Sequence, residues 1–147
     1  MKTSSSLVVG DIVKTLGFYS LNDGGSALYK IREKTTSDIE DNALIHFVGD
    51  SLVAELIIEK EINIKQLGCK CDGLNDDTIS FRKALNLSKE KGLPLIIEGL
   101  VRLTEPVNIN DTVIKGNSYS RSTFNHFDIW SDGVIKDYIT SKAAKFL

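Results

Sequence analysis

The chain has 147 residues, of which 41% are hydrophobic and 26% charged, and its formal net charge is -2. This length favours one domain or two small ones, and the weak net charge gives no reason to expect nucleic acid or an anionic membrane as partner. No apolar run approaches the ~18 residues of a membrane span, and the N-terminus lacks the ~7-residue apolar run of a signal peptide. We therefore expect a protein that is made and folded in a cytoplasm.

The first 60 residues are predicted to form about four short strands separated by turns. The strands are rich in β-branched and aromatic residues, and the Asn-Asp-Gly-Gly turn at 22–25 favours positive φ. The polar stretch 32–42 has no periodicity and is predicted to be a loop. The expected strands cover residues 11–21, 26–33, 43–48 and 52–59.

The aromatic residues of this first part have two interpretations, core packing or stacking against a ligand. They lie on or beside the predicted strands, which favours the core. The residues concerned are Phe18, Tyr19, Tyr29 and Phe47.

Residues 63–85 place two cysteines and three aspartates just before a predicted helix, which raises the questions of a metal site and an acidic catalytic site. Cys69 and Cys71 are too close in sequence for an easy disulfide, and the chain has no other cysteine. A metal site requires about four ligands, whereas His46 and His126 show no ligand spacing. Small side chains in a tight loop are therefore the favoured interpretation, and we expect no metal or cofactor.

The hydrophobic period changes to that of a helix over about 77–91. Phe81, Ala84, Leu85 and Ser88 recur at helical spacing, and Gly92 and Pro94 follow as breakers. The residues Asp76, Asp77 and Thr78 suit the N-cap, where a side-chain oxygen accepts from the free amides of the first turn. At least one of the two aspartates is therefore expected to cap this helix.

Short strands separated by turn residues are predicted after the helix. Closely spaced short strands are typical either of an antiparallel meander or of the first coils of a solenoid, and the pattern alone does not choose between them. The expected strands cover residues 93–98, 100–104, 107–109 and 112–116.

Residues 64–116 resemble the opening of the pectate-lyase-like right-handed parallel β-helix, which begins with a phenylalanine-glycine-alanine-lysine-glycine-aspartate-glycine phrase. Two aspartates and a threonine follow in that family and start a helix that caps the solenoid. Cys69 and Cys71 depart from the usual alanine and glycine. The positions that match this pattern are Gly68, Lys70, Asp72, Gly73, Asp76, Asp77 and Thr78.

Residues 10–31 and 50–57 resemble the module that precedes this β-helix in tail spikes and pre-neck appendages of phages of Gram-positive hosts. The resemblance implies a mainly β fold in which a small β module, residues 1–62, is followed by a capping helix and the first β-helix coils, residues 63–117. It also implies a homotrimer attached at its N-terminal end to other virion tail or collar proteins. The distal β-helix of such appendages binds or cleaves cell-wall glycans.

The remaining residues, 118–147, are expected to form a C-terminal extension with a helix over about 133–147. Its apolar residues fall near one face, which serves equally for packing on the last coil or for contact at a three-fold axis. The second alternative makes Tyr138, Ile139 and Phe146 candidate interface residues.

Two functions were weighed, a structural anchor of a tail spike and a glycan hydrolase or lyase. A glycosidase needs two carboxylates ~5–10 Å apart in a cleft, and Asp72, Asp76 and Asp77 could supply them. Their predicted turn and cap roles already explain these residues, and the chain has room for one to three coils. We therefore expect a non-enzymatic virion component that is assembled in the host cytoplasm, with no catalytic residues.

Overall fold

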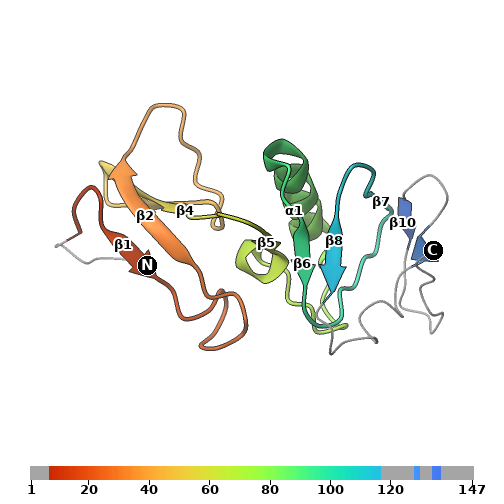
Figure 1. The fold of residues 1–147 in the computed structure, drawn as a ribbon. Coiled ribbons are helices and arrows are strands. Elements are labelled where there is room, and N and C mark those ends of the chain that lie inside the picture. Colours follow the sequence, from red (N-terminus) through yellow and green to blue (C-terminus); the bar gives the residue numbers. More distant parts are fainter. Residues whose placement is uncertain (1–6, 117–127, 130–133, 137–147) are drawn as a thin grey trace. The chain divides into compact units, whose positions relative to one another are not determined.

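The computed structural model describes residues 7–116, 128–129 and 134–136. The chain forms two compact units, Met1–Glu59 and Lys60–Leu147 (Figure 1). The sequence pattern had suggested a boundary after residue 62. Ile62 pairs with Leu95 of the second unit, which explains why the division falls before it.

The first unit contains a four-stranded antiparallel sheet with the strand order β1-β2-β4-β3. β2 is central and pairs with β1 on one side and with β4 on the other, while β3 forms a tight hairpin with β4. The four strands are β1 (Ile12–Lys14), β2 (Leu28–Glu33), β3 (Ile45–Val48) and β4 (Leu52–Leu56).

One face of this sheet builds the core of the first unit. Tyr29 and Ile31 of β2 are buried while Lys30 between them is exposed, as expected for a strand with one face against the core. The Tyr29 hydroxyl donates a hydrogen bond to the Ala43 carbonyl at 3.1 Å. The buried residues of this unit are Ala27, Tyr29, Ile31, Ala43, Val53, Ala54 and Leu56.

The strand predicted over 11–21 is much shorter in the structure, because the chain turns away after Lys14. The Asp23 carboxylate accepts hydrogen bonds from the backbone amides of four residues, at 2.7–3.2 Å, which closes a compact loop instead. Tyr19 lies on this loop and is 59% exposed, so the expectation that it packs in the core is wrong. Phe18 and Phe47 are half-buried.

The second unit contains a three-stranded parallel sheet with the order β5-β6-β8. The strands are β5 (Ile62–Asn63), β6 (Leu95–Ile97) and β8 (Ile114–Gly116). Leu95 is the partner of Ile62 on one side and of Ile114 on the other. An isolated parallel bridge joins Asp72 to Leu100. The predicted parallel stacking is therefore present at these strands.

The helix α1 (Thr78–Lys91) occupies the range in which the sequence period predicted one. Phe81, Ala84, Leu85 and Ser88 are all buried, so the predicted apolar stripe is the packed face. The helix contacts β6 and the short 3-10 helix η1 (Ile64–Leu67). It ends at Gly92, whose φ of +66° is favourable only for glycine.

Three expectations for the rest of the second unit need correction. Residues 100–104 form no regular strand, although Val101 and Leu103 are buried in alternation with the half-buried Leu100 and Arg102. β7 (Val107–Asn108) pairs antiparallel with β10 (Val134–Lys136), which also pairs with β9 (Asp128–Ile129). The helix predicted over 133–147 therefore does not include residues 134–136, and the rest of that range lies outside the described residues.

Candidate functional site

The loop formed by residues 68–78 carries the sequence motif, and it lies along residues 99–104. The Leu100 amide donates to the Cys71 carbonyl at 2.8 Å, and the Gly73 amide donates to the Leu100 carbonyl at 2.7 Å. The Asp77 amide donates to the Arg102 carbonyl, also at 2.8 Å. Two segments 25–29 residues apart in sequence are thus joined by backbone hydrogen bonds.

Asp77 is the buried centre of this arrangement, with only 2% of its surface exposed. Its carboxylate accepts from the backbone amides of Lys70 at 2.7 Å, Cys71 at 3.2 Å and Arg102 at 3.3 Å. Burial raises the pKa of Asp77, and the three amides oppose that shift in part. The carboxylate makes no capping hydrogen bond to α1, so its role is to hold the loop against Arg102.

Asp76 makes the contact that was expected of a helix cap. Its carboxylate accepts from the Thr78 amide at 3.0 Å and from the Thr78 and Thr104 hydroxyls at 2.5 and 2.8 Å. The Thr78 hydroxyl in turn accepts from the Thr104 amide at 2.9 Å. The hydrogen bond with Thr78 is the main cause that lowers the pKa of Asp76. These residues fasten the start of α1 to residue 104.

Asp72 shapes the exposed tip of the same loop. Its carboxylate accepts from the Leu74 and Asn75 amides, both at 2.8 Å, and these contacts lower its pKa. Lys70 extends over the tip and donates to the Asn75 side-chain carbonyl at 3.2 Å. Gly73 has a φ of +73°, which allows the turn to reverse beside Leu100.

The two cysteines are buried and free. Cys71 has a φ of +53°, so the cysteine adopts the left-handed conformation that the glycine of the resembled motif would favour. Hydrogen bonding to Cys71, together with burial, raises the pKa of the Cys69 thiol. A raised pKa disfavours the thiolate, which is the reactive and metal-binding form. Cys69 is therefore suited to packing in the loop.

Gly99 is one of the turn residues predicted between the strands that follow the helix, and the 68–78 loop depends on it. Its φ is +98°, and a Cβ atom there would lie 2.4 Å from the Cys71 carbonyl oxygen. Any side chain would push residues 99–100 away from the loop. Gly68 also has a left-handed φ, of +93°, where it ends η1.

The carboxylates of Asp72, Asp76 and Asp77 were the sequence candidates for acid-base catalysis. The structure brings them into one loop, yet each accepts hydrogen bonds from backbone or hydroxyl groups of that loop or of residues 102–104. An acid or base for glycan cleavage has to face the substrate across a cleft. These three side chains therefore hold the loop and residues 102–104 together. Among the described residues, no cluster of three or more metal-binding side chains is found.

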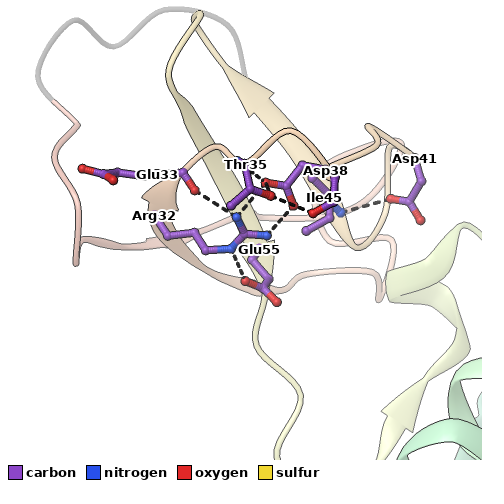
Figure 2. Close-up of polar contacts among 8 residues, drawn as sticks. Arg32, Glu33, Thr35, Asp38, Asp41, Ile45 and Glu55 are labelled. Atoms are coloured by element: carbon purple, nitrogen blue, oxygen red, sulfur yellow. Dashed lines mark hydrogen bonds and ion pairs between the residues drawn. The ribbon is translucent and has the colours of Figure 1, made fainter.

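A second polar cluster, missed by the sequence reasoning, lies on the first unit (Figure 2). Arg32 forms two hydrogen bonds with the Asp38 carboxylate, at 2.8 and 2.7 Å, and an ion pair with Glu55. Arg32 is the main cause of a strongly lowered pKa at Asp38. The Asp38 carboxylate also accepts from the Thr35 amide at 2.7 Å, so the cluster fixes the 34–38 turn. The threonine-to-aspartate spacing across this turn is the signal that was available.

An open hollow of about 550 Å³ lies beside this cluster. Its lining includes Val9, Glu33, Lys34 and Asp50, and most of the side chains are exposed and mixed in charge. It offers no buried group that would act as acid, base or ligand.

The candidate interface residues Tyr138, Ile139 and Phe146 lie outside the described residues. Within the described part of the chain, no helix has the length and apolar character needed to cross a membrane.

Comparisons with known proteins identify a fold but no family. No family model matches the chain, and no curated protein matches it significantly by sequence. Full-length tailspike protein 2 from Escherichia coli O157:H7 bacteriophage CAB120 matches 78% of this chain with a TM-score of 0.57 and 15% identity. The enzymatically active domain of tailspike protein 2 from bacteriophage CBA120 also matches 78%, with a TM-score of 0.58 and 15% identity.

These similarities show a tailspike-like fold. This chain spans only 15% of the first structure and 16% of the second. The structure of the enzymatically active domain alone matches the same share of this chain, 78%, as the full-length structure does. The likeness therefore involves a part of the tailspike protein that is present in that domain.

Proposed function

We propose that this chain is a structural component of a trimeric phage tail spike, the anchor that leads into a parallel β-helix and attaches the host-recognition part to the particle. The tailspike-like fold supports the tail-spike part of the proposal. The anchor role rests on the resemblance of residues 10–31 and 50–57 to the module that precedes the β-helix in such appendages. The parallel order β5-β6-β8 is the arrangement that successive coils of a β-helix would have. In this proposal the loop of residues 68–78 and α1 form the cap of the first coil.

The proposed assembly follows from the shortness of the parallel stack. A sheet of three short parallel strands leaves unpaired edges, and a solenoid needs about three or more repeats to bury a continuous core. A closed three-fold assembly would cover such surfaces without growing into fibres. The partners would be two further copies and other virion tail or collar proteins, with host cell-wall glycan bound by the distal part of a longer appendage.

Light scattering of the purified chain tests the assembly. The proposal predicts a particle about three times the 16.2 kDa of one chain. If Ile139 lies in the interface, as proposed from the sequence, Ile139→Asp should dissociate it, because a buried unpaired charge is strongly destabilising. Lys142→Asp, at a position that the sequence pattern places off the apolar stripe, should leave it intact. A stable monomer at micromolar concentration would refute the assembly, and an Ile139→Asp trimer would refute the proposed interface.

A glycan-cleaving enzyme is the second candidate, favoured by the match to the enzymatically active tailspike domain. The engaged carboxylates of Asp72, Asp76 and Asp77 favour the structural role. The two candidates differ in an assay of reducing ends released from bacterial cell-wall polysaccharide. The structural proposal predicts none from this chain, and release that persists in the Asp76→Asn variant would also exclude Asp76 as a catalytic residue.

A further inference from the structure

The antiparallel sheet of the first unit has two edge strands, β1 and β3, and they differ in what lies beside them. The outer side of β3 is occupied. Its Ile45 amide donates to the Asp41 carboxylate at 3.0 Å, as Figure 2 shows, and its Phe47 amide donates to Glu40 at 3.1 Å. The Asp41 amide also donates to the Ile45 carbonyl. Edge strands protected in this way do not accept another strand.

The outer side of β1 has no such cover in the part of the chain that the structure describes. Gly10 and Thr15 donate to β2-side carbonyls at 2.8 Å, and Asp11 accepts from Ile31 at 2.8 Å. Because antiparallel partners alternate, the intervening residues Ile12 and Lys14 direct their backbone N–H and C=O groups away from β2. The open edge is therefore the three residues of β1, Ile12–Lys14, where Ile12 and Lys14 offer their outward N–H and C=O groups for pairing.

The exposed sheet face beside this edge alternates apolar and basic side chains. Ile12 lies opposite Lys30, and Lys14 lies opposite Leu28. Ile12 is 56% exposed and Leu28 is 45% exposed, and both lysines are exposed. A strand added at this edge would place its own side chains next to Ile12 and Lys14 on the same face.

We propose that the β1 edge binds an extended segment of another polypeptide by strand addition, with an apolar side chain beside Ile12 and an acidic one beside Lys14. Main-chain hydrogen bonds to Ile12 and Lys14 supply the affinity, and the two side chains select the sequence. An acidic residue beside Lys14 gains an opposite-charge cross-strand contact. The inference concerns the first unit alone and does not depend on membership of a tail spike.

A second copy of this chain fits the edge less well. Two β1 edges paired about Val13 would place Lys14 beside Ile12 of the other copy, which leaves both lysines without an acidic partner. The other edge strand, β3, contains no acidic residue and is already covered. A second copy is therefore the poorer occupant in that register, and the proposal commits to a segment of a different protein.

The experiment uses the full chain labelled with nitrogen-15 and two synthetic peptides, acetyl-Thr-Val-Thr-Glu-Thr-Val-Thr-amide and its counterpart with lysine in place of glutamate. We expect the Glu peptide to shift the amide signals of Ile12 and Lys14 and to bind about fivefold more tightly than the Lys peptide. Lys14→Glu should reverse that preference. Lys91→Glu, an exposed charge change on α1, should leave it unchanged.

Three results would overturn the proposal. The first is the absence of shifts at Ile12 and Lys14 with millimolar Glu peptide. The second is protection of these two amides from hydrogen exchange without peptide, which would mean that the edge is already paired. The third is a peptide preference that Lys14→Glu does not alter, because charge would then not select the partner.

Discussion

Replacing Asp77 with alanine tests the packing of the 68–78 loop. The substitution leaves the amides of Lys70, Cys71 and Arg102 without their acceptor; the Cys71 contact is buried and the other two are part-buried. An unsatisfied buried donor costs on the order of 1–3 kcal/mol and a part-buried one less, so the three together would cost on the order of 3–4 kcal/mol. Part of this loss of stability is offset, because the substitution also removes a carboxylate whose raised pKa shows that its burial is unfavourable. We therefore expect a loss of about 3 kcal/mol.

Urea denaturation of the full chain measures this loss, and amide hydrogen exchange locates it. Exchange should accelerate at residues 70, 71 and 102 of the Asp77→Ala variant. Asp72→Ala is the matched control in the same loop, because its two amide contacts are exposed and should be worth less than about 1 kcal/mol. The reasoning is refuted if Asp77→Ala unfolds like the control and exchange at the three amides is unchanged.

Three further predictions concern single residues. Gly99→Ala should lower stability by more than about 2 kcal/mol, measured by thermal unfolding, because of its φ and the clash with Cys71; an unchanged melting temperature would contradict it. Asp23→Ala should speed amide exchange over residues 18–25. Because the pKa of Asp23 is lowered in the folded state, its contribution to stability is present above pH ~4 and is lost as the pH falls through the folded pKa. The Asp23→Ala variant should not show this acid-induced loss of stability. Asp77→Asn tests the opposite sign. Because the pKa of Asp77 is raised in the folded state, the wild type should lose stability relative to this variant as the pH rises from about 4 through the folded pKa. Stability curves of the two proteins that run parallel with pH would count against it.

The elements that the sequence predicted well are those defined by local pattern. The stripe of Phe81, Ala84, Leu85 and Ser88 and the breaker Gly92 mark α1 within one residue of its observed start. Parallel stacking could not be predicted from pattern alone, because the partners Leu95 and Ile114 are 19 residues apart and each strand is only three residues long. That expectation came from the resemblance.

The contacts that the sequence did not reveal join distant residues or use side chains in place of strand pairing. Asp77 had the local signature of a helix cap, but its carboxylate accepts from the amide of Arg102, 25 residues away. Asp76 makes the cap contact instead. The residues after Lys14 had strand-forming composition, yet the Asp23 carboxylate collects their amides into a loop. Composition reports neither of these alternatives, because both depend on where a single carboxylate points.

The arrangement of copies and strands in the purified chain is the most direct test of the proposed tail-spike role. An experimental structure of the assembled chain, by crystallography or electron cryomicroscopy, determines both. The proposal predicts three copies about one axis, each with β6 and β8 in the parallel register that joins Leu95 to Ile114. A single copy, or antiparallel pairing of β6 with β8, would contradict it.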